Sequence, residues 1–199
     1  MLLTTNMQLE LVTTFILDKL KRELSPSITY HNADHTKDVM RAVKEIGAGE
    51  QVSNEELTIL STAALFHDTG FLQSPENHES YGCDIARKHL PYYVYNKQDI
   101  NRICHLIMTT KMPQTPKTHL EKIICDADLD YLGREDFFEI SERLYEEMRA
   151  LGTVSSHEEY MQIQLNFLSA HHYFTHTAKK MRNKIKEENL TKIKTNWEA

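Results

Sequence analysis

The sequence predicts an all-α protein with a single domain of about eight helices. Its 199 residues include only six glycines and five prolines, and 40% of them are hydrophobic. Few turn residues, together with many Leu, Lys and Glu, favour helices over a turn-rich β fold. Apolar side chains recur every three or four residues in most segments, whereas no segment alternates apolar and polar residues as a half-buried strand would. A chain of this length is long enough to bury one good core.

The first three helices are delimited by turn residues and by one N-cap. An amphipathic helix is expected from about residue 7 to 21, and Ser25-Pro26-Ser27 ends it. A second helix runs to about residue 46, where Gly47-Ala48-Gly49 closes it. Ser53 is typical of an N-cap, so a third helix starts there and ends at His67-Asp68.

The remaining helices follow from the same signals. A polar loop leads to a helix over 78–90, which Pro91 ends. A helix over 97–110 precedes a loop with two prolines, and a helix over 118–132 ends at Gly133. Further helices are expected around 134–150 and 156–178, with a last piece to about residue 197.

Composition limits the function classes. The net charge of −6 argues against general affinity for nucleic acid. The odd number of cysteines, without a Cys-x-x-Cys pair or a signal peptide, indicates a reduced, cytoplasmic protein whose cysteines are small core residues. No apolar run reaches the roughly 20 residues of a membrane span. The basic stretch Lys179–Lys194 is expected to pack on the domain or on a second subunit of a homo-oligomer; a contact with RNA or an acidic partner is the alternative.

Three separate apolar stripes carry an out-of-place polar residue: His35, His67 and Asp128, with Asp68 beside His67. A single buried histidine is most often satisfied by local hydrogen bonds. Two imidazoles and two carboxylates from three helices, however, can surround one divalent ion. The imidazoles favour Mn, Fe, Ni or Zn over Ca, and the carboxylates keep Mg open.

The order His35, His67-Asp68, Asp128 resembles the H…HD…D signature of the HD-domain superfamily of metal-dependent phosphohydrolases. The resemblance spans about residues 25–135 and implies the helical HD-domain (phosphodiesterase-like) fold, with these four residues as metal ligands. The family's Ala-Asp pair matches Ala127-Asp128, and Asp126 is the alternative ligand. Residues 1–24 would then form a helix packed on the catalytic core, and 136–199 a helical extension of the same domain.

A second motif, Tyr30-His31-Asn32-Ala33-Asp34-His35, is similar to the Tyr-His-Asn-x-x-His motif of cyclic nucleotide phosphodiesterases. That resemblance implies hydrolysis by a metal-activated water, with His31 as the general acid that protonates the leaving oxygen; a helix-terminal role in backbone hydrogen bonding is the alternative. Thr69-Gly70-Phe71 stands where those enzymes have a further histidine after His-Asp. The motif therefore supports phosphoester chemistry more than a cyclic nucleotide substrate.

Three more residues are candidates for binding the substrate. His78, in Asn77-His78-Glu79, resembles the His-Glu step that follows the HD pair in many of these proteins, although a helix-capping role fits equally. Lys111 and Arg134 are the cations best placed to meet a phosphate. We therefore expect a metal-dependent phosphohydrolase acting on a small phosphomonoester or phosphodiester of the nucleotide or cyclic nucleotide class. The alternative is a catalytically silent sensor module that keeps the metal site or binds a nucleotide.

Overall fold

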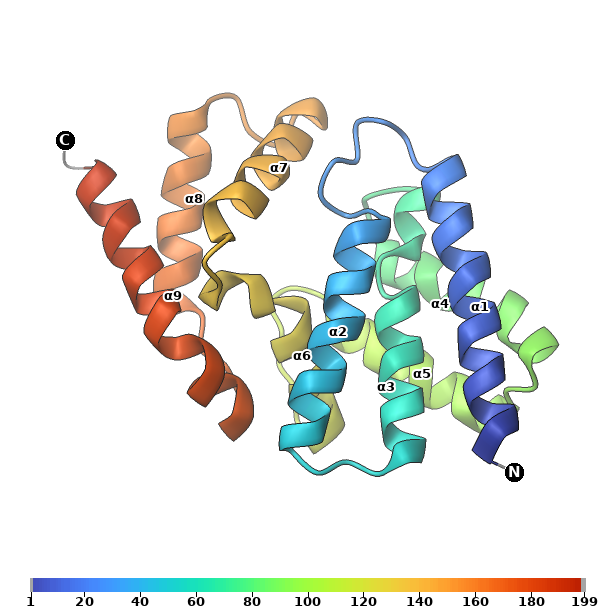
Figure 1. Cartoon of the computed structure of the whole chain (residues 1–199). Helices are drawn as coiled ribbons and strands as arrows, with labels where there is room; N and C mark the ends of the chain where they lie inside the picture. The colour runs from blue at the N-terminus through green and yellow to red at the C-terminus, as the bar shows by residue number, and fades with distance from the viewer. Residues whose placement is uncertain (1, 198–199) are drawn as a thin grey trace.

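The computed structural model describes the backbone of residues 2–197 and the side chains of residues 8–195. Over this part of the chain the structure is entirely helical, with nine α-helices and three short 3₁₀ helices (Figure 1). The predicted all-α fold is confirmed. The α-helices are α1 (Leu2–Glu23), α2 (Ala33–Gly49), α3 (Asn54–Phe66), α4 (His78–His89), α5 (Lys97–Thr109), α6 (His119–Asp128), α7 (Phe137–Ala150), α8 (His157–Ala170) and α9 (His176–Trp197). The 3₁₀ helices are η1 (Thr69–Leu72), η2 (Leu90–Tyr93) and η3 (Asp130–Gly133).

The larger hydrophobic core is built around α3. Every residue from Ile59 to Phe66 is buried, because α3 packs against α1, α2, α5 and α6 at once. Its start is fixed by a capping box. The backbone amide of Glu56 donates to Ser53 Oγ, and the backbone amide of Ser53 donates to Glu56 Oε2. Cys83, Cys104 and Cys125 are all buried free thiols, as predicted.

A smaller hydrophobic core lies between α7, α8 and α9, which stand together on one side of α2 and α6 in Figure 1. Residues of η3 and Tyr30 belong to this second core. Tyr30 directly precedes the first motif histidine, and η3 directly follows α6. The segments that carry the candidate site residues therefore border both cores.

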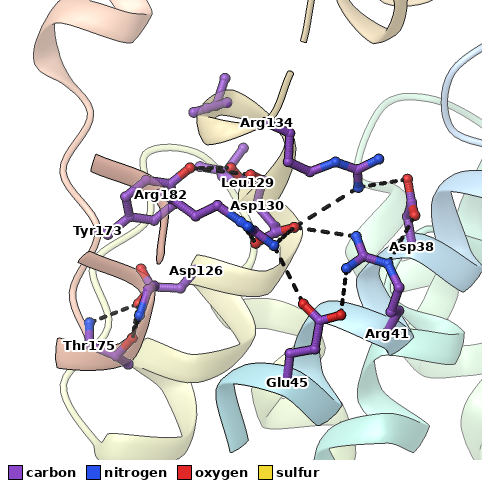
Figure 2. Close-up of polar contacts among 12 residues, drawn as sticks. Asp38, Arg41, Glu45, Asp126, Leu129, Asp130, Arg134, Tyr173, Thr175 and Arg182 are labelled. Carbon is purple, nitrogen blue, oxygen red and sulfur yellow. Dashed lines mark hydrogen bonds and ion pairs between the residues drawn. The ribbon is translucent and has the colours of Figure 1, made fainter. Parts of the chain in front are cut away.

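Arginines on α2 and α9 connect the parts of the chain around the two cores, because both pair with one buried carboxylate (Figure 2). Asp130 in η3 is 3% exposed. Arg182 of α9 donates to both of its oxygens, at 2.6 Å and 3.1 Å, and Arg41 of α2 approaches at 3.4 Å. A buried carboxylate requires such pairing. The α9 helix is therefore held against η3, where Gly133 also leaves room for the backbone of Arg182.

Two predicted helix boundaries are wrong. The helix over 118–132 is interrupted at Leu129, after which the chain continues as the 3₁₀ helix η3. The helix over 156–178 ends at Ala170, and α9 begins at His176. Asp126 accepts hydrogen bonds from the backbone amides of Phe174 and Thr175, and this tertiary contact stabilises the break (Figure 2).

None of the helices in residues 2–197 combines the length and the apolar character needed to cross a membrane.

Candidate metal centre

Three helices deliver the candidate ligands to one point. His35 lies in the first turn of α2, whose start is capped by Asn32 accepting from the amides of Asp34 and His35. The capping fixes the direction in which the first turn leaves the Tyr30–His31 segment. His67 is the C-cap of α3, and Asp128 is the last residue of α6. Helix ends thus bring residues 35, 67 and 128 together.

The nitrogen and oxygen atoms of this cluster lie within coordination range of a common centre. His35, His67 and Asp128 each offer one atom, and these atoms all lie within 4.8 Å of one another. The two Nε2 atoms are 3.3 Å apart, and Asp128 Oδ1 is 3.3 Å from His67 Nε2. Asp68 Oδ2 reaches the same place, 2.9 Å from His67 Nε2 and 3.3 Å from His35 Nε2.

The hydrogen bonds around the cluster fit a cation. His67 Nδ1 lies 2.8 Å from the carbonyl oxygen of Ala64, which can only accept. The ring therefore carries a proton on Nδ1, which turns Nε2 towards the cluster. Asp68 Oδ2 is buried and has no hydrogen-bond partner within the described residues. A buried carboxylate oxygen beside two imidazole nitrogens is an environment that a divalent metal satisfies.

Electrostatics point in the same direction. Burial alone would lower the pKa of His67, but Asp68 and Asp128 raise it well above its ordinary value. They also raise the pKa of His35 despite its burial. Conversely, burial would raise the pKa values of Asp68 and Asp128, yet the histidines hold both below the usual range. The cluster therefore keeps two carboxylates ionised and attracts positive charge.

His31 lies beside the cluster and is held by a carboxylate that sequence reasoning missed. The helix α2 begins only at Ala33, so His31 precedes it. Its Nδ1 contacts Glu147 Oε1 of α7, and the backbone amides of Tyr30 and His31 donate to Glu147 Oε2 at 2.8 Å and 3.0 Å. Glu147 follows Ile140 and Leu144 on one helix face, so the same stripe pattern that marked Asp128 could have found it.

Burial would raise the pKa of Glu147, but its hydrogen bonds with His31 and with the two amides lower it. Glu147 is thus an ionised, 1% exposed acceptor for the imidazole N–H of His31. The ring of His31 stacks on Phe71 at 4.2 Å, and its side chain stays 23% exposed. Its other nitrogen, Nε2, makes no hydrogen bond with the residues that the structure describes.

His78 approaches the cluster from α4. Its Nδ1 lies 2.9 Å from the carbonyl oxygen of Pro75, and this hydrogen bond fixes the orientation of the ring and therefore of Nε2. Nε2 is 3.5 Å from Asp68 Oδ1 and 3.4 Å from Glu79 Oε1. The ring is also 6.2 Å from that of His31. His78 therefore borders the cluster next to the His31 ring.

The other candidates lie further out. Lys111 is exposed, and its Nζ donates to Asn77 Oδ1 at 3.3 Å, directly before His78. Arg134 lines a narrow pocket with His35 and Asp128, but its guanidinium is engaged by Asp38 and Asp136. Both carboxylate oxygens of Asp126, the alternative ligand, accept hydrogen bonds from the loop before α9, including one from Thr175 Oγ1 at 2.7 Å.

The comparisons with known proteins concern this same region. The family model of the HD domain matches residues 32–131. A comparison with curated proteins finds no match to the sequence.

Solved structures resemble the whole fold. YpgQ from Bacillus subtilis in complex with ADP has 20% sequence identity and a TM-score of 0.68, covering 96% of this chain and 94% of its own. A predicted HD superfamily hydrolase from an uncultured Thermotogales bacterium has 21% identity and a TM-score of 0.61, covering 92% of each chain. A Lactobacillus plantarum protein has 19% identity and a TM-score of 0.64, covering 96% of this chain and 97% of its own.

Proposed function

The chain belongs to the HD domain family, and from this premise we propose that it is a metal-dependent phosphohydrolase. Its substrate would be a small phosphomonoester or phosphodiester of the nucleotide class. The proposed ligands of the divalent ion are His35, His67, Asp68 and Asp128. The observation that carries the proposal is the convergence of His35, His67 and Asp128 on one point. Asp68 Oδ2 lies against both histidines there, buried and without a hydrogen-bond partner within the described residues.

The set of donors suits a transition metal or Mg²⁺. Two imidazoles favour Mn, Fe, Ni or Zn, and two carboxylates keep Mg possible. When bound, such an ion supplies Lewis acidity towards a phosphoryl oxygen and lowers the pKa of a water towards neutrality.

His31 is the proposed proton donor. Glu147 accepts the hydrogen bond from Nδ1, so the ring is held in one orientation and presents Nε2 to a substrate. An imidazole can hold and release a proton near neutral pH, which suits the protonation of a leaving oxygen. Phe71 packs flat against the ring and limits its rotation.

A phosphate-containing substrate also needs positive charge, and the chain supplies little near the ligands. Lys111 is the exposed cation beside His78, whereas Arg134 is already paired with Asp38 and Asp136. We therefore assign phosphate contacts to His78 and Lys111 before Arg134. YpgQ, which shares the fold, has been crystallised with ADP, and this supports a nucleotide as the substrate class.

A silent metal-binding or nucleotide-binding sensor is the second candidate function. Such a module needs the metal ligands or a nucleotide site but no proton donor. The pairing of His31 with a buried carboxylate from another helix favours the enzyme, because a silent module has no use for an oriented imidazole.

The experiment separates metal binding from turnover. The purified protein, freed of metal with EDTA, would be titrated with Mn²⁺ and assayed for hydrolysis of three substrate classes. Release of phosphate or pyrophosphate would be measured for nucleoside monophosphates and triphosphates. Formation of the nucleoside monophosphate would be measured for cyclic nucleotides, because opening their ring releases no phosphate. Asp68→Asn should lose both Mn²⁺ binding and turnover. His31→Gln should keep Mn²⁺ and lose about 10²- to 10⁴-fold in kcat, the usual contribution of a general acid. His172→Gln, an exposed and remote histidine, should change neither.

Each outcome has a distinct meaning. Mn²⁺ binding without turnover on any substrate class would identify the silent module. Full turnover by Asp68→Asn would refute the proposed site, and full turnover by His31→Gln would remove His31 from the mechanism while leaving the ligands in place.

A further inference from the structure

The two oxygens of Asp128 have different partners. Oδ1 faces the imidazoles, 3.3 Å from His67 Nε2 and 3.6 Å from His35 Nε2. Oδ2 accepts a hydrogen bond from Gln114 Nε2 at 3.0 Å. Gln114 lies in the loop between α5 and α6, outside every motif that the sequence suggested. Asp128 therefore directs Oδ1 towards the cluster, while Gln114 holds Oδ2.

The orientation of the Gln114 amide follows from its neighbours. Nε2 also lies 3.4 Å from the carbonyl oxygen of Thr110, the residue that caps α5. A carbonyl oxygen and an ionised carboxylate can only accept, so the amide must turn its NH₂ group towards both. The opposite rotamer would set Oε1 against two acceptors. The amide is thus fixed by α5 at one side and Asp128 at the other.

The amide oxygen of Gln114 makes no hydrogen bond in this orientation. Gln114 Oε1 is buried and has no hydrogen-bond partner. A buried acceptor without a partner lowers the stability of the folded state. Fold stability alone does not account for a side chain that accepts this cost, since an apolar side chain of the same length would avoid it. The hydrogen bond to Asp128 is the interaction that only the glutamine provides.

We propose that Gln114 is a positioning residue that sets the affinity of the metal centre by orienting Asp128. The inference rests on the proposed function, since it needs Asp128 to be a ligand. Without the Gln114 donor the carboxylate can rotate, and Oδ1 loses its fixed direction towards His35 and His67. Partners of metal ligands typically change metal affinity by about 10- to 100-fold when they are removed.

The test compares two glutamines that each have a buried, unpartnered Oε1, with Mn²⁺ as the probe. Gln114→Met keeps the length of the side chain and removes both the donor and the unsatisfied Oε1. We expect Mn²⁺ affinity, measured by calorimetry on EDTA-treated protein, to fall about 10- to 100-fold. The melting temperature of the metal-free protein should change little, because the lost hydrogen bond and the removed unsatisfied acceptor offset each other.

Gln164 on α8 provides the matched control. It is 3% exposed, and its Oε1 is likewise buried and without a partner, but its helix α8 contributes Leu168 to the second core. Gln164→Met should leave Mn²⁺ affinity unchanged. Gln114→Asn keeps an amide that falls short of Asp128 by about 1.5 Å, one bond length, and should lose affinity as Gln114→Met does. It also serves if the methionine variant does not fold.

Mn²⁺ affinity within about threefold of the wild type in either Gln114 variant would overturn the inference, since that is well below the effect expected of a ligand's partner. A fall in the melting temperature of the metal-free protein without a change in affinity would assign Gln114 to structure alone. If the folded wild type itself binds no Mn²⁺, the proposed function fails, and this inference fails with it.

Discussion

Glu147 illustrates how a single buried residue connects distant parts of this chain. Its two oxygens serve the imidazole of His31 and two backbone amides, 116 and 117 residues away in the sequence. A buried carboxylate with these partners is stable because each lone-pair region that faces the protein meets an N–H. The same contacts hold the segment that carries His31 just before α2.

Glu147→Gln should therefore lower catalysis and leave metal binding intact. The amide can no longer act as a charged acceptor for the His31 N–H, so the ring loses its orientation and we expect kcat to fall about 10- to 100-fold, less than the full contribution of a general acid. Steady-state kinetics with saturating Mn²⁺ would measure this. Glu146→Gln, at the exposed neighbouring position, is the control; an equal loss in both variants would contradict the role of Glu147.

Glu121 provides a second residue-level prediction, on stability. Burial would raise the pKa of this carboxyl, but the amides of Lys117 and Thr118 and the imidazole of His105 lower it to about 2. A carboxyl whose pKa is lower in the folded than in the unfolded state stabilises the fold above its unfolded value, about 4.3, and that contribution disappears as the pH falls towards 2.

We therefore expect Glu121→Gln to lower the free energy of unfolding at pH 7 by about 2 kcal/mol, the value of a hydrogen bond to a charged group. The difference from the wild type should shrink as the pH falls from 4.5 towards 2. Urea unfolding at several pH values would measure it, with the exposed Glu76→Gln as the control. A difference that is constant with pH would show that the charge of Glu121 contributes nothing.

At the scale of elements, η1 and α4 approach more closely than any residue but glycine permits. A Cβ atom on Gly70 would lie 1.9 Å from the carbonyl oxygen of His78, a backbone atom. In the sequence, Gly70 only follows the predicted end of the third helix at His67-Asp68. The structure gives Gly70 a specific role, because its missing side chain allows α4 to bring His78 next to the cluster of His35, His67, Asp68 and Asp128.

Gly70→Ala should consequently destabilise the protein by about 3 kcal/mol or more, the upper range for overpacking. It should also weaken Mn²⁺ binding, since α4 must move away from Asp68. Gly152→Ala is a useful contrast, because Gly152 has a φ of +71° but no atom within 4 Å of the added Cβ. That variant should cost about 1–2 kcal/mol from backbone conformation alone. Equal effects of the two substitutions would contradict the close contact.

Helix positions were predictable where local signals set them, and not where distant contacts did. Ser53 begins α3 through its own capping box, and the sequence showed both partners. The break between α8 and α9 has neither glycine nor proline; it depends on Asp126, 48 residues before Phe174. The cluster of His35, His67 and Asp128 could be predicted because each of the three residues interrupts an apolar stripe. Gln114 could not, because a loop has no period against which an exception stands out.

For the whole molecule, the proposed metal centre lies where the two cores meet. The helices α2, α3 and α6, which bring the proposed ligands together, belong to the larger core. Tyr30 and η3, the neighbours of His31 and Asp128 in the chain, belong to the second core. A bound ion would therefore stabilise both cores together. At a free Mn²⁺ concentration 100 times Kd the gain is about 2.7 kcal/mol, and for a chain of this size that raises Tm by about 5–10 °C.

Differential scanning calorimetry with Mn²⁺ or with EDTA would test this coupling. We expect a single transition in both conditions, shifted as a whole to higher temperature by Mn²⁺, and no shift in Asp68→Asn. The pairing of Asp130 with Arg41 and Arg182 supports one cooperative unit. If either core unfolded alone, the buried carboxylate of Asp130 would lose one of its arginine partners, which is costly. Two transitions, of which Mn²⁺ moves only one, would instead show that α7, α8 and α9 unfold independently of the metal centre.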